Sequence, residues 1–242
     1  MVRETYSTKA IVLKREAFRE TDTRVIFYSE DQGKLELVAR GTKKISSKLA
    51  GHLEPFNLVE LMVVPGKQWD YVGTARNERA FAGIKADLTK LALAGEALAI
   101  FNKIIKAGIA DCDIFFLLNE YLVALDALRV ADGWQLRLAS DGFILKLLSR
   151  LGYRPELKLC VNCGGKVANG SVKFSARKGG TICVSCVKTE RGELLTLSEK
   201  SYILLNHLLA SGAGKNALVK SDELTAGEIN KVVSTFYKYH FV

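Results

Sequence analysis

Several features that mark membrane, secreted or disordered proteins are missing from this sequence. Only three of its 242 residues are proline, which argues against a long disordered or polyproline segment. Charged residues interrupt every apolar stretch before the roughly 18–20 residues that a membrane-spanning helix needs. The first ten residues lack the apolar core of a secretory signal. We therefore expect a cytoplasmic protein with no membrane partner.

The motifs of common enzyme classes are also missing. The Gly-Lys pairs at 66–67 and 214–215 lack the spacing of a GxxxxGK[ST] phosphate loop. There is no GxSxG, no HExxH and no dinucleotide-binding fingerprint. The three histidines, His52, His207 and His240, have no acidic or cysteine partner at a useful spacing. We therefore expect no catalytic residues and a protein that acts by binding, not as an enzyme.

Positive charge is the main compositional signal. Lys and Arg total 35 against 26 Asp and Glu, which gives a net charge of +9. Residues 1–80 carry +3, residues 81–152 are neutral and residues 153–242 carry +6. A basic protein attracts polyanions such as nucleic acid, although spare lysines can also serve solubility alone. The composition leaves both interpretations open.

Residues 5–80 are predicted to form β-strands. Five short runs rich in Val, Ile, Leu and aromatic residues alternate partly with polar residues, and turn signals lie at 31–33 and 65–67. Gly33 is free to adopt a positive φ in the first of these turns. Five short strands without a long helix predict a small closed barrel. The runs are TKAIVLKRE, TRVIFYSED, GKLELVARG, FNLVELMVV and WDYVGTARN.

Residues 84–151 change to helical spacing of apolar side chains, and three helices of roughly 15–20 residues fit them. The third is predicted from Trp134 to Leu151, with Gly152 as its C′ residue. Two later helices are predicted over 198–211 and 222–239, with Ser198 and Asp222 as their N-caps.

The predicted fold class is therefore α+β. A five-stranded barrel domain is expected over 1–80 and a helical domain over 81–242. The helical domain carries an insertion at about 154–191, which is rich in Gly, Cys and Lys and does not fit a long helix.

Four of the five cysteines form two Cys-x2-Cys pairs separated by 19 residues. This spacing turns both sulfurs of a pair toward one ion, and two pairs complete a tetrahedral thiolate shell with Zn–S near ~2.3 Å. Gly164 and Gly165 follow the first pair, as a tight turn around a metal requires. Soft thiolates favour zinc, with iron as the main competitor. We expect one structural Zn²⁺ ion bound by Cys160, Cys163, Cys183 and Cys186.

Other interpretations of the cysteines stay open. A redox Cys-x2-Cys would need only one pair, at the start of a helix after a strand. An iron–sulfur cluster fits the spacing as well, and the four cysteines can also be unrelated structural residues. Cys112 stands alone in a helical stretch and is expected to be a buried apolar residue. Residues 154–191 hold eight basic groups against Glu156 and Glu190, which suits a nucleic-acid contact or the solubility of an exposed module.

A second concentration of charge lies within fifteen residues of the predicted barrel, where only Glu36 opposes five basic residues. Ser46 and Ser47 can donate hydrogen bonds to phosphate oxygens, and Gly41 lets the backbone approach a ligand closely. A basic loop on a small barrel is a recurrent way to hold single strands, although it can also be a plain solvated loop. The five residues are Lys34, Arg40, Lys43, Lys44 and Lys48.

Aromatic side chains near this basic segment offer faces on which bases can stack. The competing interpretation is that most of them fill the barrel core. We expect Phe27 in the core and leave Trp69 and Tyr71 open. The six rings are Tyr6, Phe18, Phe27, Tyr28, Trp69 and Tyr71.

The order of these parts resembles the RecO family of bacterial recombination mediators. A basic five-stranded barrel is followed by a helical domain and by a four-cysteine ribbon before two last helices. The segments that carry the resemblance are KAIVLKREAFRETD, GKLELVARGTKK, LAGHLEPFNLVEL and FILKLLSRLGYRPELKLCVNCG. The last is the most specific, since it joins the third helix directly to the first cysteine pair. All four cysteines of the zinc-bearing members are matched here.

The resemblance implies an OB-fold barrel and a DNA-binding mediator of recombinational DNA repair. Members of the family bind single- and double-stranded DNA and anneal complementary strands. With the partner RecR they help RecA load onto DNA coated by single-stranded-DNA-binding protein, which places them in the cytoplasm at the nucleoid. By analogy the DNA-contact candidates are Lys34, Arg40, Lys43, Lys44 and Lys48, followed by Arg15, Arg19 and Arg24.

Two other functions remain as alternatives. A zinc-ribbon module acting on RNA or on the transcription apparatus has the same composition, because a preference for the 2′-hydroxyl is not readable from sequence. A thiol oxidoreductase using the cysteine pairs would need at least one exposed thiolate of low pKa.

Overall fold

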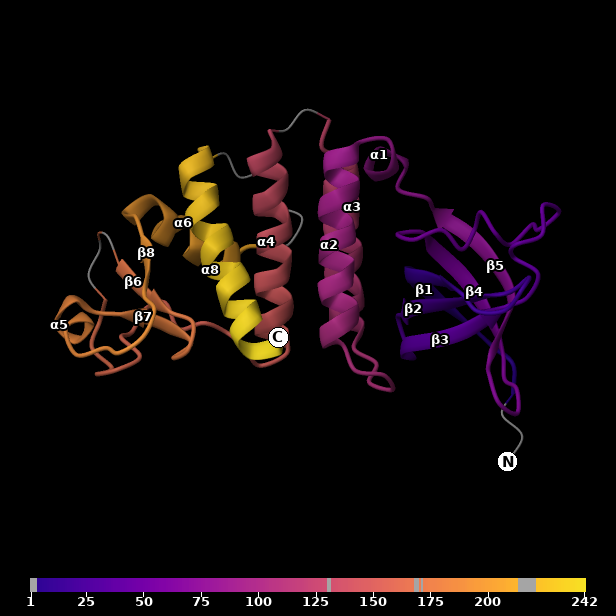
Figure 1. Cartoon of the computed structure of the whole chain (residues 1–242), viewed down its shortest axis with the longest axis horizontal. Helices are drawn as coiled ribbons and strands as arrows, with labels where there is room; N and C mark the ends of the chain where they lie inside the picture. Colours follow the sequence, from indigo (N-terminus) through magenta and orange to yellow (C-terminus); the bar gives the residue numbers. More distant parts are fainter. Residues whose placement is uncertain (1–3, 130–131, 168–169, 171, 213–220) are drawn as a thin grey trace. The chain divides into compact units, whose positions relative to one another are not determined.

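The computed structural model describes residues 4–129, 132–167, 170, 172–212 and 221–242 (Figure 1). The chain divides into two compact units, Met1–Asp126 and Ala127–Val242. Within the described ranges, every helix is either too short or too polar to cross a lipid bilayer.

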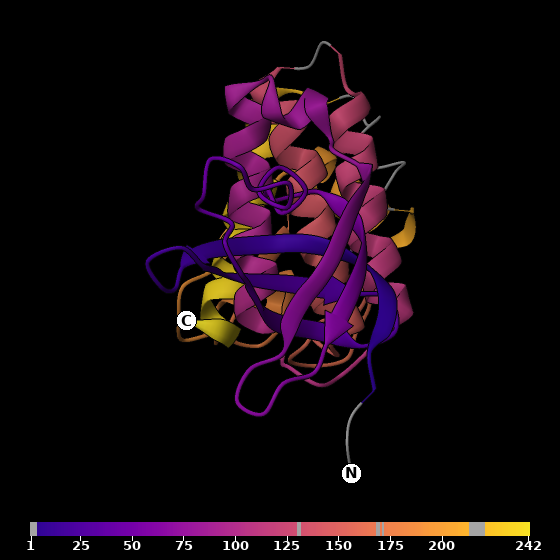
Figure 2. The same ribbon diagram turned by 90° about the vertical axis from the view of Figure 1, so that its right-hand side faces the viewer.

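The first unit contains a closed five-stranded barrel (Figure 2). Strand β1 pairs antiparallel with both β2 and β4, β2 with β3, and β4 with β5. One parallel pair, Val38 with Tyr71, joins β3 to β5 and closes the barrel in the order β1-β2-β3-β5-β4. The expected OB-type barrel is therefore present. Its strands are β1 (Tyr6–Ala17), β2 (Thr23–Ser29), β3 (Gly33–Ala39), β4 (Leu58–Val64) and β5 (Tyr71–Arg79).

Alternation along each strand builds the barrel core. Inward-facing residues such as Val25, Phe27 and Leu61 are fully buried, which confirms the expectation for Phe27. The turn before β3 is also as predicted, because Gly33 has φ +69°. A Cβ atom at Gly33 would lie 2.3 Å from the carbonyl oxygen of Ile109, so no other residue fits this position without a shift.

Three helices complete the first unit: α1 (Ala82–Lys85), α2 (Leu88–Ile104) and α3 (Cys112–Ala127). The Asp87 carboxylate caps α2 by accepting hydrogen bonds from the backbone N–H groups of Thr89 and Lys90. The prediction for Cys112 was wrong, since this side chain is exposed. It is the first residue of α3 and lies two residues before Ile114, where the buried stripe of that helix begins.

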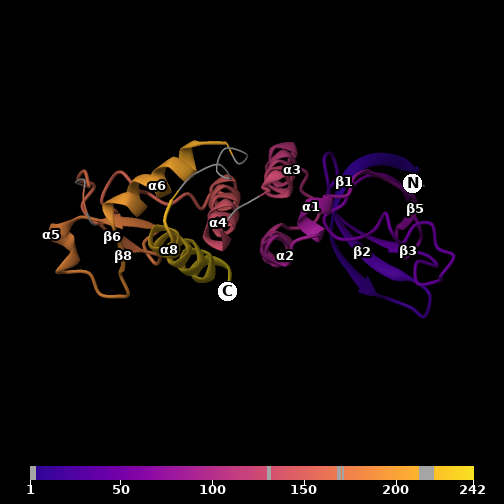
Figure 3. The same ribbon diagram turned by 90° about the horizontal axis from the view of Figure 1, so that it is seen from above.

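The second unit packs α4 (Gly133–Arg150), α6 (Glu199–Ala210) and α8 (Glu223–Phe241) against one another (Figure 3). The predicted helix end is confirmed, because Gly152 has φ +91° and follows α4. Ser198 and Asp222 cap α6 and α8 through their side chains, as predicted. Between α4 and α6 lie β6 (Val172–Ser175), β7 (Gly180–Ile182), α5 (Val184–Val187) and β8 (Leu195–Leu197).

Candidate metal centre and candidate nucleic-acid surface

Two tight turns present the paired cysteines. In the first, the N–H of Gly164 donates to the carbonyl of Cys160 at 2.8 Å, and the N–H of Cys160 donates to the carbonyl of Gly165 at 2.8 Å. Gly164 has φ +71°, a conformation that favours glycine. In the second turn, the N–H of Cys186 donates to the carbonyl of Cys183 at 3.0 Å, where α5 begins. Each Cys-x2-Cys therefore forms a knuckle.

The two knuckles converge on one point. The four cysteine sulfurs all lie within 4.8 Å of one another, and those of Cys163 and Cys183 are 3.7 Å apart. In a tetrahedral thiolate site with metal–sulfur bonds near ~2.3 Å, neighbouring sulfurs are separated by about 3.8 Å. The four cysteines are therefore close enough together to hold one metal ion.

The electrostatics of the cluster fit a cation. Burial opposes ionisation of the Cys160 thiol, but N–H groups of Cys183, Cys163 and Asn162 point at its sulfur and lower its pKa to about 6. The thiol of Cys186 faces the sulfurs of Cys183 and Cys163, and its pKa is raised to about 12. Four thiolates this close repel one another, and a divalent cation removes that repulsion.

A carboxylate braces the first knuckle from outside. The side chain of Glu190 is only 2% exposed. Its oxygens accept from Arg177 at 2.6 Å, Lys178 at 2.9 Å and the Asn162 amide at 3.1 Å. Lys178, Asn162 and Arg177 together lower the pKa of Glu190 to about 2. Asn162 lies between Cys160 and Cys163, and Arg177 and Lys178 lie in the turn between β6 and β7, so Glu190 links the first knuckle to the β6–β7 hairpin. Two of the eight basic groups of residues 154–191 are therefore paired with this carboxylate.

Contacts with the helices hold the cysteine segment in the second unit. The Tyr202 hydroxyl on α6 donates to the carbonyl of Leu157 at 2.7 Å. Phe174 on β6 packs edge-on against Phe236 on α8, with ring centroids 5.9 Å apart. Loss of order around the cysteines would therefore reach α6 and α8.

A second candidate site lies on the barrel, where arginines cover aromatic rings. Phe18 and Trp69 meet edge to face with centroids 5.5 Å apart, and the Arg24 guanidinium lies 5.0 Å and 5.5 Å from the two centroids. Arg19 lies over Phe18 at 5.1 Å. Arg40 lies over Tyr71 at 4.0 Å. We call Phe18, Arg19, Arg24, Arg40, Trp69 and Tyr71 the arginine–aromatic surface.

The basic loop, residues 41–50, is joined to this surface. The N–H of Lys43 donates to the carbonyl of Thr21 at 3.0 Å, and its Nζ donates to the carbonyl of Arg19 at 2.7 Å. The N–H of Gly41 donates to the Asp22 carboxylate at 2.9 Å, which lowers the pKa of Asp22. Of the predicted contacts, Arg40, Lys43, Lys44 and Lys48 are exposed here, and Arg19 is exposed beside them.

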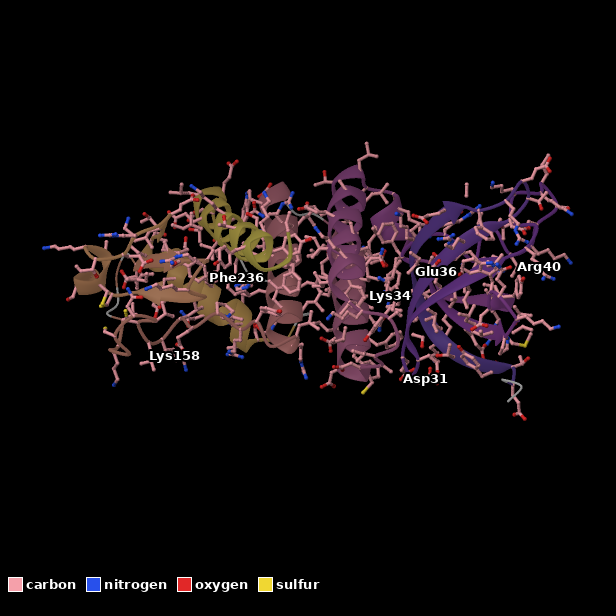
Figure 4. All side chains as sticks on the ribbon, turned by 60° about the horizontal axis from the view of Figure 1, so that its bottom comes forward. Asp31, Lys34, Glu36, Arg40, Lys158 and Phe236 are labelled. Atoms are coloured by element: carbon pink, nitrogen blue, oxygen red, sulfur yellow. The ribbon has the colours of Figure 1, made fainter. Side chains whose placement is uncertain are left out.

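Three predicted contacts have other partners. The Arg24 guanidinium forms an ion pair of 3.1 Å with the Glu36 carboxylate. The Nζ of Lys34 donates to the carbonyls of Asn102 at 2.6 Å and Ile105 at 3.3 Å, and burial lowers the pKa of Lys34. Figure 4 shows Lys34 on the side of the barrel that faces α2, away from Arg40. Arg15 donates to the Glu54 carboxylate at 2.6 Å and to the carbonyl of Ala50 at 3.2 Å, so it braces the basic loop from behind.

The rings divide between core and surface. Tyr28 is fully buried, and its hydroxyl donates to the carbonyl of Asp111 at 3.3 Å; burial raises its pKa to about 12. Phe18, Trp69 and Tyr71 are half-buried and belong to the arginine–aromatic surface. Sequence reasoning missed the organising carboxylates Asp22 and Glu190. Both lie in segments that also hold basic residues, and nothing in the local sequence distinguishes them from the acids nearby, such as Glu20 and Glu193.

Comparison with known proteins finds similarity along most of the chain. Residues 1–80 match the family model described as recombination protein O N terminal, and residues 85–241 match recombination protein O C terminal. A protein of Thermoanaerobacter sp. (strain X514) named DNA repair protein RecO is 27% identical over 233 residues, which cover 96% of this chain and 91% of the relative.

Two further relatives have the same name. The protein of Desulforamulus reducens is 28% identical over 235 residues, which cover 97% of this chain and 89% of the relative. The protein of Rubrobacter xylanophilus is 32% identical over 181 residues, which cover 75% of this chain and 71% of the relative.

Proposed function

Because this chain belongs to the recombination protein O family, which supports a role in DNA repair and recombination, we propose that it is a DNA-binding recombination mediator. It acts by holding and arranging strands rather than by changing a covalent bond. The observation that carries the proposal is the arginine–aromatic surface and its connection to the exposed basic loop.

Rings and cations together suit a single strand. Stacking of a base on an aromatic side chain contributes about 1–3 kcal/mol and tolerates any sequence, because every base has a π-face. Trp69, Phe18 and Tyr71 supply such faces, and the arginines over them supply further planes. Arg40, Lys43, Lys44 and Lys48 then neutralise phosphates, with Arg19 and Arg24 beside the rings.

Lys34 and Arg15 have supporting positions in this proposal. Lys34 on β3 binds a carbonyl at the end of α2. Arg15 binds the carbonyl of Ala50, the last residue of the basic loop. Both keep the contact residues in place without meeting phosphate themselves.

We also propose the finer activities of the family for this chain. It binds single- and double-stranded DNA and anneals complementary strands, and with RecR it helps RecA load onto DNA coated by single-stranded-DNA-binding protein. The family match supports these partners, and the chemistry is compatible with them. A protein that neutralises phosphates on two strands reduces the repulsion between them, so pairing becomes more favourable.

For the cysteine cluster we propose one structural Zn²⁺ ion, bound by Cys160, Cys163, Cys183 and Cys186. Four thiolates leave no open position for water or substrate, which is typical of structural zinc. When bound, the ion supplies a fixed crosslink. The knuckles, the Glu190 brace and the Phe174–Phe236 contact then hold the ribbon on the helices.

The proposed function is tested by fluorescence anisotropy with a labelled single-stranded DNA across a salt series. We expect binding that weakens steeply as salt rises. The double variant Lys43→Glu/Lys44→Glu should lose about tenfold or more in affinity, since two phosphate contacts become repulsive. Lys231→Glu/Lys238→Glu is the matched control, because it changes the net charge equally with two exposed lysines of α8.

Three results would overturn the proposal. The first is the absence of DNA binding by the unaltered protein at low salt. The second is an equal loss of affinity in both double variants, which would mean that net charge alone attracts DNA. The third is a strong preference for RNA over DNA of the same sequence in the same buffer, which would favour an RNA-binding module.

A further inference from the structure

Ile45 lies at the tip of the basic loop with its side chain entirely in solvent. Its relative exposure is 108%, the highest among the large hydrophobic residues of the described ranges. Single exposed apolar residues are common on protein surfaces, so exposure alone indicates no function. What distinguishes Ile45 is the way the loop presents it and the charges around it.

The loop holds Ile45 at the corner of a tight turn. The N–H of Ser47 donates to the carbonyl of Lys44 at 2.9 Å, which makes Ile45 the second residue of a hydrogen-bonded turn. The preceding turn is closed by the N–H of Lys44, which donates to the carbonyl of Gly41 at 3.1 Å. The stem below is fixed by a buried hydrogen bond of 2.7 Å between the hydroxyls of Thr23 and Thr42. These hydrogen bonds restrict the backbone of the loop, which reduces the entropy that the loop loses when it meets a ligand.

The chemistry around Ile45 selects a polyanion. Residues 41–50 contain three lysines and no acidic residue, and all three lysines are exposed. The other large apolar residue of the loop, Leu49, packs against the barrel core. Ile45 is therefore the apolar side chain that the fold leaves free. An apolar tip between cations matches a ligand in which negative groups alternate with flat apolar surfaces, as phosphates alternate with bases along a nucleic acid strand.

We propose that Ile45 is a wedge that inserts between two neighbouring bases of DNA bound on the basic loop and unstacks them. The inference rests on the proposed function. Apolar side chains act in this way in proteins that part base steps, while basic residues hold the flanking phosphates. Here Lys44 and Lys48 flank the wedge, and Lys43 continues to the arginine–aromatic surface through the carbonyl of Arg19. An opened step exposes the faces of the two bases that were stacked on each other.

The test uses single-stranded DNA that contains 2-aminopurine, a base whose fluorescence rises when it is unstacked from its neighbours. The unaltered protein should raise the fluorescence on binding. Ile45→Ser should bind within about threefold of the same affinity, because the phosphate contacts remain, yet lose most of the fluorescence rise. Ile45→Leu should retain the rise. Leu88→Ser is the matched control, since Leu88 is 85% exposed at the start of α2 and lies outside the loop.

Each contrary outcome has a separate meaning. If Ile45→Ser binds the DNA and raises the 2-aminopurine fluorescence as the unaltered protein does, Ile45 does not act as a wedge, while the proposed DNA binding is unaffected. If the unaltered protein does not bind DNA at all, the proposed function fails first. An anionic lipid surface has a similar pattern of charge beside apolar groups. Binding to phosphatidylserine vesicles that depends on Ile45, with no 2-aminopurine response, would therefore replace the wedge by a lipid contact.

Discussion

The Nζ of Lys34 lies 2.6 Å from the carbonyl oxygen of Asn102, so a lysine of strand β3 occupies the C-terminal end of helix α2. Its second acceptor, the carbonyl of Ile105, belongs to the residue that ends the helix. Carbonyls at this end of a helix lack intrahelical partners and carry partial negative charge, which a cation stabilises. One side chain thus links the barrel to the helix that follows it.

Lys34→Met is predicted to weaken the fold and spare DNA binding. The loss of a half-exposed charged hydrogen bond should cost about 1 kcal/mol in the free energy of unfolding. Urea denaturation measures this cost, and anisotropy should give a DNA affinity within about twofold of the unaltered protein. A large drop in DNA affinity with an unchanged free energy of unfolding would show that Lys34 contacts phosphate.

Trp69→Ala is predicted to weaken single-stranded DNA binding by about 1–3 kcal/mol, the usual contribution of one base–aromatic stack. The slope of log affinity against log salt should stay the same, because no cation is removed. Trp134→Ala is the control, since Trp134 is the other tryptophan and is also half-buried but lies on α4. Equal affinities for Trp69→Ala and the unaltered protein would exclude stacking at this position.

Lys44→Ala should change the salt dependence of DNA binding, whereas Trp69→Ala should leave it unchanged. Removing one phosphate contact is expected to reduce the magnitude of the salt slope by about 0.7, the value for one contact on a single strand. The affinity at high salt should barely change. A salt titration over a tenfold range resolves this difference, and an unchanged slope would show that Lys44 meets no phosphate.

Cys160→Ser is predicted to lose the bound metal and to lower the melting temperature by about 5 °C or more, because binding of a structural ion is coupled to local folding. Residues 154–191 should become sensitive to protease. Cys112→Ser is the matched control, because Cys112 is exposed and lies outside the cluster. Metal content measured with a chromogenic chelator should fall only in the first variant. Equal metal content in both would mean that Cys160 is not a ligand.

Glu190→Gln tests the brace on the first knuckle through its pH dependence. The folded pKa of Glu190 is lowered to about 2 from an ordinary value of 4.5. The unfolded state therefore binds the proton more readily, and the carboxylate stabilises the fold fully above about pH 4.5. That contribution is lost as the pH falls toward 2. The difference in stability between the two proteins should be constant above pH 5 and shrink below it; a difference that grows on acidification would contradict the assignment.

Local patterns predicted the elements well. Alternation located all five strands, and the caps Ser198 and Asp222 and the glycine after α4 were found because each depends on a few adjacent residues. The cysteine spacing predicted that the two knuckles meet, since the two-residue spacing restricts how each pair can turn.

Partners distant in sequence were not predictable in the same way. Alternation places Lys34 on the outer face of its strand, but it does not say that α2 covers that face. The position of Arg24 over both Phe18 and Trp69 depends on how the end of β1, the start of β2 and the β4–β5 connection come together. A cysteine side chain is apolar enough for a protein core, but Cys112 is exposed because α3 begins at this residue and its buried face begins at Ile114. The sequence pattern does not locate the start of a helix to one residue.

The closure of the barrel has a consequence for hydrogen exchange. Strands β3 and β5 are joined through one residue pair, Val38 with Tyr71, whereas the other four strand junctions are six or seven pairs long. The N–H of Val38, which donates to the carbonyl of Asp70 at 2.9 Å, should therefore exchange with solvent sooner than the amides of the longer junctions. Arg40 lies over the ring of Tyr71, so DNA bound to the arginine–aromatic surface would contact the barrel at its shortest junction. Hydrogen exchange at the Val38 amide should then become slower when DNA is added.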